Sequence, residues 1–157
     1  MTSNEQPNTP VADTTTPDEL WVERTGTRTY TGRNSRGGEV KIAPLDTADA
    51  FSPGELLKIA LAGCTGLTAD EVIARRLGAD FQARIDVAGV KNLELDRYPE
   101  LTEEFRLDLS SLAEKERAKL LIILRRAVEE HCTVSRTITQ GTVVQLQVVD
   151  TAPEPTS

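Results

Sequence analysis

The sequence contains little cysteine or histidine: Cys64, Cys132 and His131 are the only such residues among 157. A structural zinc site usually takes four Cys or His ligands. Because this chain cannot supply four, and no metal or nucleotide motif is visible, we expect no metal and no other cofactor. A redox pair of two thiols remains compatible with the count.

Long hydrophobic runs and basic stretches are also lacking. The longest nearly uncharged apolar segment, Ile59–Leu67, is far shorter than the ~20 residues of a membrane-spanning helix. The net charge is −7 with no basic stripe to neutralise phosphates, which argues against nucleic-acid binding. The N-terminus lacks the basic and apolar regions of a secretory signal. We therefore expect a cytosolic protein that binds neither membrane nor nucleic acid.

Lysine and arginine are absent from both ends of the chain. Residues 1–18 and 151–157 hold five of the eight prolines and four acidic residues, and we expect both to be disordered tails. Since those four acids lie in the tails, residues 19–150 carry a net charge of only −3. This segment has the common size of one domain with its own core, so a single domain is predicted.

The strands are predicted from alternation. Residues 20–42 indicate an antiparallel meander of short strands, because threonines, aromatics and valines are interleaved with charges. Residues 79–95 and 103–109 alternate in the same way, and residues 142–149 (TVVQLQVV) predict a last strand.

The first helix is predicted from its capping signals. Ser52, Pro53 and Glu55 form a capping-box start, and the helix should run to about Leu77 and stop at Gly78. Its first half is apolar on almost every side, whereas a surface helix carries one apolar stripe. We therefore expect a buried central helix.

A second helix is predicted from Ser111 as cap, with Glu114 three positions later, to about His131. A short turn or helix should follow over residues 132–140. The order strands, helix, strands, helix, strand indicates an α+β fold.

Two interpretations of each cysteine follow from its surroundings. Cys64 lies in the middle of the first helix and is either a small core residue or a reactive thiol. Gly63 and Gly66 favour the second, since glycine in a helix interior costs about 1 kcal/mol relative to alanine and indicates close approach by a backbone or substrate. Cys132 is either a thiol without a role or a redox partner. His131, at a helix end, is expected to interact with terminal carbonyls rather than act in catalysis.

Two segments resemble the signatures of the OsmC/Ohr family, the osmotically inducible protein C and organic hydroperoxide resistance proteins. The first contains SPGELL at residues 52–57 and ALAGCT at residues 60–65, and the second is HCTVSRTI at residues 131–138. The resemblance covers about residues 20–150. It implies antiparallel sheets around a buried central helix, an intertwined homodimer, and a thiol peroxidase that reduces organic or inorganic hydroperoxides.

The resemblance also implies roles for single residues. Cys64 matches the thiol that attacks peroxide, and Cys132 matches the thiol that converts the sulfenic acid to a disulfide. Arg33 falls where the hydroperoxide-resistance branch has an arginine, which would lower the thiol pKa, and Arg36 is a nearby competitor. An exposed arginine without a catalytic role is the alternative for either. An external dithiol of lipoyl type, or a small thiol, would be the reductant.

One position departs from the family. The hydroperoxide-resistance branch has a glutamate where this chain has Gly54, and Glu55 follows one position later. A helix places Glu55 about 13.5 Å from Cys64 along its axis and about 180° around it. Glu55 therefore reaches a thiol only from a partner chain or after a helix break, and we expect its capping role ahead of a catalytic one.

Two alternatives to a peroxidase stay open. A non-enzymatic redox sensor or small-molecule binding member is favoured by the missing glutamate at Gly54 and by Thr133, where many family members have proline. A structural dimer with inert buried thiols is the other alternative.

Overall fold

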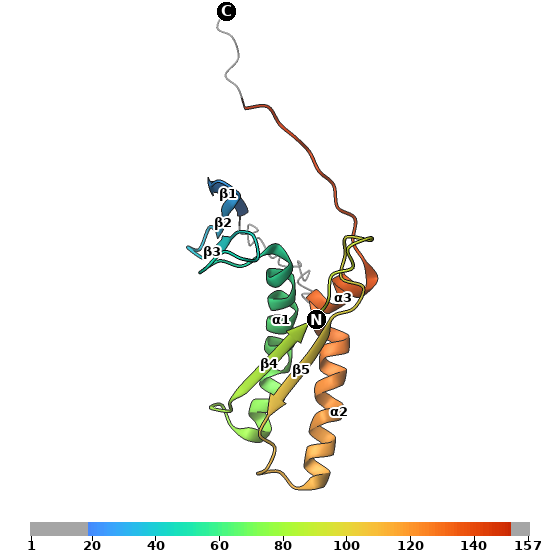
Figure 1. Cartoon of the computed structure of the whole chain (residues 1–157). Helices are drawn as coiled ribbons and strands as arrows, with labels where there is room; N and C mark the ends of the chain where they lie inside the picture. The colour runs from blue at the N-terminus through green and yellow to red at the C-terminus, as the bar shows by residue number, and fades with distance from the viewer. Residues whose placement is uncertain (1–18, 152–157) are drawn as a thin grey trace, which may run out of the picture. The chain divides into compact units, whose positions relative to one another are not determined.

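The structure is a computed structural model that describes residues 19–151. The predicted tails at residues 1–18 and 151–157 lie outside the described residues, except for residue 151. Figure 1 shows small antiparallel sheets and helices, which confirm the α+β class. The described residues fall into two compact units, one ending at Pro53 and the other starting at Gly54. A single domain over residues 19–150 stays a prediction. Within residues 19–151, no helix has the length and apolar character needed to cross a membrane.

The first unit is built on a three-stranded antiparallel sheet. Strands β1 (Leu20–Gly26), β2 (Thr29–Asn34) and β3 (Glu39–Ile42) pair in chain order, which confirms the predicted meander. Residues of neighbouring strands that face each other project on the same side of a sheet. Arg33 faces Glu39 across the β2–β3 pair, so these two side chains share one side.

Helix α1 (Pro53–Leu77) opens the second unit and has the predicted bounds. It ends at Gly78, whose φ of +92° is readily adopted only by glycine. Its C-terminal half is anchored in the core, but Ile59 is 45 % exposed and Leu67 is 82 % exposed. A single chain therefore covers only part of this apolar helix.

Strands β4 (Ala83–Ala88) and β5 (Thr102–Leu107) form an antiparallel pair, shorter at both strands than the alternation predicts. Figure 1 shows this pair lying across α1 and the next helix. The core of the second unit lies between these elements. Its residues are Ala69, Ile73 and Leu124, packed against Leu77, Phe81, Phe105, Leu107 and Val128.

Helices α2 (Glu114–His131) and α3 (Thr133–Gln140) follow. The predicted cap at Ser111 is wrong, because the cap position is Ala113, whose side chain makes no hydrogen bond. A turn precedes the helix, and it is closed by the Leu112 N–H, which donates to the carbonyl three residues back. Ser111 lies within this turn instead of at the cap position.

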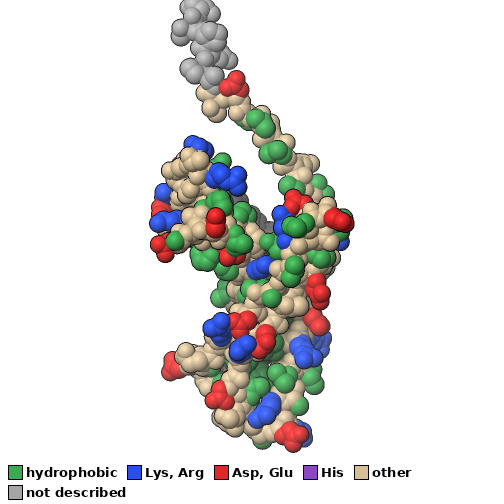
Figure 2. Space-filling model, in the orientation of Figure 1, with side chains coloured by type: hydrophobic (Ala, Val, Ile, Leu, Met, Phe, Trp, Pro, Cys, Tyr) green, Lys and Arg blue, Asp and Glu red, His purple; other side chains and the backbone are tan. Residues whose placement is uncertain are grey.

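The predicted last strand is not formed in the single chain. Residues 141–151 have no regular secondary structure, and Figure 2 shows apolar side chains along this extended segment. A strand needs an edge that pairs with its N–H and C=O groups, and this segment has none in one chain. Its apolar side chains are 69–90 % exposed: Val143, Val144, Leu146, Val148 and Val149.

Candidate functional site

Two free thiols from distant parts of the sequence meet in the second unit. Cys64 lies near the middle of α1 and is half-buried, whereas Cys132 connects α2 to α3 and is fully buried. The Cys132 thiol lies close enough to Cys64 to help lower the pKa of that cysteine. The fold therefore brings together the two cysteines that the sequence singled out.

The start of α3 stabilises the Cys64 thiolate. The first N–H groups of a helix have no partner inside it and favour a negative charge. Burial by itself raises the pKa of Cys64, but the N–H groups of Val134 and Thr133 and the Cys132 thiol favour the thiolate. The net result is a pKa of Cys64 below its ordinary value.

The pKa of Cys132 is shifted in the opposite direction, above its ordinary value. Burial raises the pKa of Cys132, and the nearby Cys64 raises it further, whereas the Ser135 N–H and the Thr65 hydroxyl lower it by less. The nucleophile in thiol chemistry is the thiolate. Cys64 therefore combines the more available thiolate with the more accessible sulfur.

The two glycines beside Cys64 have different surroundings. A Cβ atom on Gly66 would lie 3.3 Å from Cδ1 of Ile85, so a side chain approaches this glycine where a backbone or substrate was predicted. Apart from its chain neighbours and the backbone of its own helix, no described atom lies within 4 Å of a Cβ placed on Gly63. Both glycines line an apolar groove of about 420 Å³ between α1 and the β4–β5 pair, together with Phe81 and Phe105.

Position 54 is glycine for a steric reason. A Cβ atom there would collide with the hydroxyl of Tyr98 and lie 2.9 Å from its Cζ. Lys58 holds this arrangement, because its Nζ lies 4.5 Å from the centre of the Tyr98 ring and donates to the Gly89 carbonyl at 2.8 Å. A glutamate side chain does not fit at position 54 while Tyr98 is in place, and Glu55 lies in the first turn of α1.

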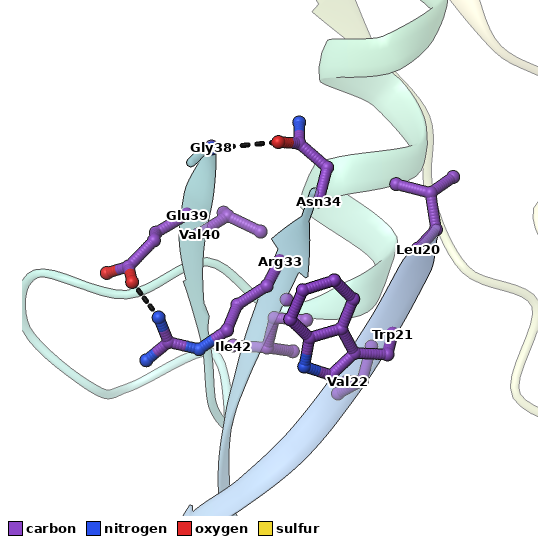
Figure 3. Close-up of a pocket in the computed structure, with 10 residues that line it drawn as sticks. Leu20, Trp21, Val22, Arg33, Asn34, Gly38, Glu39, Val40 and Ile42 are labelled. Carbon is purple, nitrogen blue, oxygen red and sulfur yellow. Dashed lines mark hydrogen bonds and ion pairs between the residues drawn. The ribbon is translucent and has the colours of Figure 1, made fainter. Parts of the chain in front are cut away.

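Arg33 lies on β2 and contacts two carboxylates of the same sheet. Its Nε is 3.1 Å from Oε2 of Glu23, and its Nη1 pairs with Glu39, toward which the side chain points in Figure 3. Arg36 lies in the turn before β3, where its N–H donates to the Asn34 side chain. Both arginines belong to the first unit, and both thiols belong to the second.

An apolar hollow of about 520 Å³ lies on the same sheet (Figure 3). Its apolar lining comes from β1 and β3 and includes Val22, which is 58 % exposed. Gly32 lies in the middle strand, and a Cβ atom there would lie 3.0 Å from Val40, so the glycine keeps the floor of the hollow open.

Sequence reasoning missed the groups that surround the thiols. A short turn or helix after Cys132 was predicted. The first N–H groups of a helix there would favour a thiolate, but the tertiary fold decides which side chain lies before them. Thr65 and Thr68 carried no signal beyond their places one and four residues after Cys64. His131 is 72 % exposed with its Nε2 3.8 Å from the Glu130 carboxylate, away from the thiol pair.

Comparisons of the sequence identify its relatives. Residues 46–147 match the family described as OsmC-like protein. An uncharacterized protein of Mycobacterium tuberculosis is 52 % identical over 132 residues, which cover 84 % of this chain and 96 % of that protein. A Mycobacterium bovis protein matches to the same extent.

Solved structures share the fold. An OsmC-like protein from Mycoplasma pneumoniae aligns with a TM-score of 0.61 and 14 % identity, covering 80 % of this chain and 89 % of that one. A putative osmotic stress induced and detoxification response protein from Psychrobacter arcticus aligns with a TM-score of 0.58 and 23 % identity, covering 75 % and 85 %. The match over residues 46–147 and the shared fold lead to one conclusion: this chain belongs to the OsmC-like family.

Proposed function

We propose that this protein is a thiol-dependent hydroperoxide reductase that detoxifies organic peroxides, with Cys64 as the attacking thiol and Cys132 as the resolving thiol. The contrast between the two thiols carries the proposal: one is accessible with a lowered pKa, and the other is buried with a raised pKa. Membership of the OsmC-like family supports a peroxide-related role. The Psychrobacter protein is described as a detoxification response protein, which agrees with that role.

The proposed reaction has three steps. The Cys64 thiolate attacks the outer peroxide oxygen, the O–O bond breaks, and the alkoxide leaves and is protonated to an alcohol, while Cys64 becomes a sulfenic acid. The Cys132 thiol then displaces water from that sulfenic acid and forms a Cys64–Cys132 disulfide. An external dithiol reduces the disulfide to two thiols and is itself oxidised to a disulfide.

Arg33 is proposed as a further group that stabilises the thiolate, with Arg36 as its competitor. Two carboxylates fix the Arg33 guanidinium, so its orientation within the sheet is set before any substrate binds. Glu55 is kept as a carboxylate that reaches the thiol only from a partner chain, because the helix places it on the opposite side from Cys64.

We also propose that the working unit is a homodimer. Two observations support it: the N-terminal half of α1 is incompletely covered, and residues 142–149 alternate like a strand without pairing to one. Large exposed apolar surfaces are uncommon on monomers and often mark an interface. A second copy of the chain carries the same exposed apolar side chains, which could pack against those of the first copy.

Peroxide turnover tests the proposal. Wild-type protein with cumene hydroperoxide and dihydrolipoamide should complete many turnovers, Cys64→Ser should show none, and Cys132→Ser should recycle slowly because it cannot form the disulfide. His131→Gln is the matched control, because His131 adjoins Cys132 in sequence but is exposed. Equal activity in the two cysteine variants contradicts the assignment.

A redox sensor is the second candidate, and the Gly54–Tyr98 contact favours it, since it leaves position 54 without a carboxylate. A sensor would undergo one slow oxidation of Cys64 and stop, whereas an enzyme turns over repeatedly with the dithiol. The same assay therefore separates them.

A further inference from the structure

Thr65 makes an unusual contact for a helical threonine. It is 5 % exposed, and its Oγ1 lies 3.9 Å from the Sγ of Cys132, which is 0 % exposed. Thr68 shows the ordinary pattern, since its hydroxyl donates at 2.8 Å to the backbone carbonyl of Cys64, four residues back. Thr65 instead directs its hydroxyl away from its own helix, to the junction between α2 and α3.

The chemistry of the two groups sets the direction of this contact. A buried hydroxyl costs free energy unless it is hydrogen-bonded, and sulfur is a weak acceptor and a weak donor. The Thr65 hydroxyl is the stronger donor, so it donates the hydrogen bond and the Cys132 sulfur accepts it. The Cys132 thiol proton then remains available to the Cys64 thiolate, and the Cys132 thiol helps to lower the pKa of Cys64. The result is a directed chain from Thr65 through Cys132 to Cys64.

We infer that Thr65 is a positioning residue for the resolving thiol: its hydroxyl holds the Cys132 sulfur beside Cys64 and stabilises it as the thiolate that leaves when the disulfide is reduced. The inference rests on the proposed Cys64–Cys132 disulfide. It goes further in two ways. It assigns Cys64 as the sulfur that the reductant attacks and Cys132 as the sulfur that leaves, and it gives a role to a residue outside the cysteine pair.

Burial decides which sulfur the reductant attacks. Cys132 is 0 % exposed, whereas Cys64 is partly accessible on α1, so an external thiolate reaches the Cys64 sulfur. A new S–S bond forms at Cys64, the Cys64–Cys132 bond breaks, and its electron pair moves to the Cys132 sulfur. The Thr65 hydroxyl donates to that sulfur, which then takes a proton from solvent. A second thiol of the reductant frees Cys64 and completes the two-electron reduction.

The leaving thiol controls the rate of such exchange, because a better stabilised thiolate leaves faster. Two groups face the Cys132 sulfur and favour its thiolate, the Ser135 N–H and the Thr65 hydroxyl. A hydrogen bond to a charged group contributes about 1.5 kcal/mol, or about tenfold in rate. The Ser135 group is a backbone N–H, which a side-chain substitution leaves in place. The Thr65 hydroxyl, by contrast, can be removed by substitution.

The test uses the whole protein and does not require peroxide. Diamide closes the disulfide, 2-mercaptoethanol reduces it, and samples quenched with iodoacetamide are followed by mass spectrometry. Thr65→Val, which keeps the volume, should be reduced about tenfold more slowly than wild type, and Thr65→Ser should return to within about twofold. Thr137→Val is the matched control, since that exposed hydroxyl donates to its own helix. In every variant the first mixed disulfide should form on Cys64.

A structural role would not give this pattern. Alkylation of Cys64 in the reduced protein should stay within about twofold of wild type in Thr65→Val, because the attacking thiolate is stabilised mainly by α3. The inference is overturned by equal reduction rates in Thr65→Val and wild type, by a loss that serine does not restore, by a mixed disulfide on Cys132, or by no disulfide with diamide. Failure of the peroxidase proposal is a separate result: no peroxide turnover in a protein whose disulfide diamide still closes.

Discussion

The hydroxyl of Tyr98 occupies the space that a Cβ atom on Gly54 would need. Lys58 lies over the Tyr98 ring and bonds to the Gly89 carbonyl, so one lysine of α1 holds both ends of the β4–β5 connection against the helix start. The departure from the family glutamate is thus a packing feature of this chain as well as a missing carboxylate.

Gly54→Ala should lower the free energy of unfolding by about 1–3 kcal/mol, because the added methyl group forces the Tyr98 ring to move. Helix propensity alone predicts the opposite sign, a gain of up to about 1 kcal/mol. Urea unfolding measures the change. In a Tyr98→Ala background the same substitution should be neutral or stabilising. A Gly54→Ala protein at least as stable as wild type would show that the steric explanation is wrong.

The fold was predictable where its signals are local. The bounds of α1 follow from Ser52, Pro53 and Gly78, which act within one turn of the helix ends. The prediction of a strand at residues 142–149 was wrong for the opposite reason. Alternation shows that a segment suits a sheet, but it does not show which strand edge the segment would pair with. The prediction of a cap at Ser111 was wrong because this serine lies in a tight turn before the helix.

The site was predictable in its reactive atoms and not in their surroundings. The resemblance indicated Cys64 and Cys132, and the structure brings them together. The family resemblance implied that an arginine lowers the pKa of Cys64, whereas within the second unit the N–H groups of Val134 and Thr133 do so. Backbone groups have no residue signature, and their direction depends on how α3 packs.

The two thiols should make stability depend on pH in opposite directions. The pKa of Cys64 is lowered, so its contribution is fully present above the unfolded thiol pKa of about 8.5 and is lost as pH falls through the folded value. The pKa of Cys132 is raised, so its contribution is present below about 8.5 and is lost as pH rises through the folded value.

Single-cysteine variants separate these contributions. Under reducing conditions, Cys132→Ser, which keeps Cys64, should become more stable as pH approaches about 8.5 from below. Cys64→Ser, which keeps Cys132, should lose stability above that pH. Urea unfolding at a series of pH values gives both curves, and parallel curves for the two variants would contradict the assigned shifts.

Leu146→Asp should shift the protein from dimer to monomer, because it puts a charge on the most exposed large apolar side chain of the C-terminal segment, at 90 % exposure. Gln147→Asp is the matched control, since it adds the same charge one residue away, on the opposite side of an extended segment. Size-exclusion chromatography with light scattering gives the masses. A monomeric wild type, or equal dissociation of both variants, argues against this segment as the interface.

Arg33→Gln should slow the reaction of Cys64 with cumene hydroperoxide about tenfold, the effect of losing about 1.4 kcal/mol of thiolate or transition-state stabilisation. Its cost in folding stability should be at most about 1 kcal/mol, because the ion pairs of Arg33 are partly exposed to solvent. Arg36→Gln is the comparison, and stopped-flow kinetics measure both rates. A loss confined to Arg36→Gln transfers the proposed role to that residue.

The most direct test of the central claim is the fate of the Cys64 sulfur after one equivalent of cumene hydroperoxide, measured by peptide mass spectrometry with dimedone as the sulfenic acid trap. The account predicts a dimedone adduct on Cys64 in Cys132→Ser, and in wild type a Cys64–Cys132 disulfide with little adduct. Unmodified Cys64 in both proteins, with the peroxide left unconsumed, would contradict it.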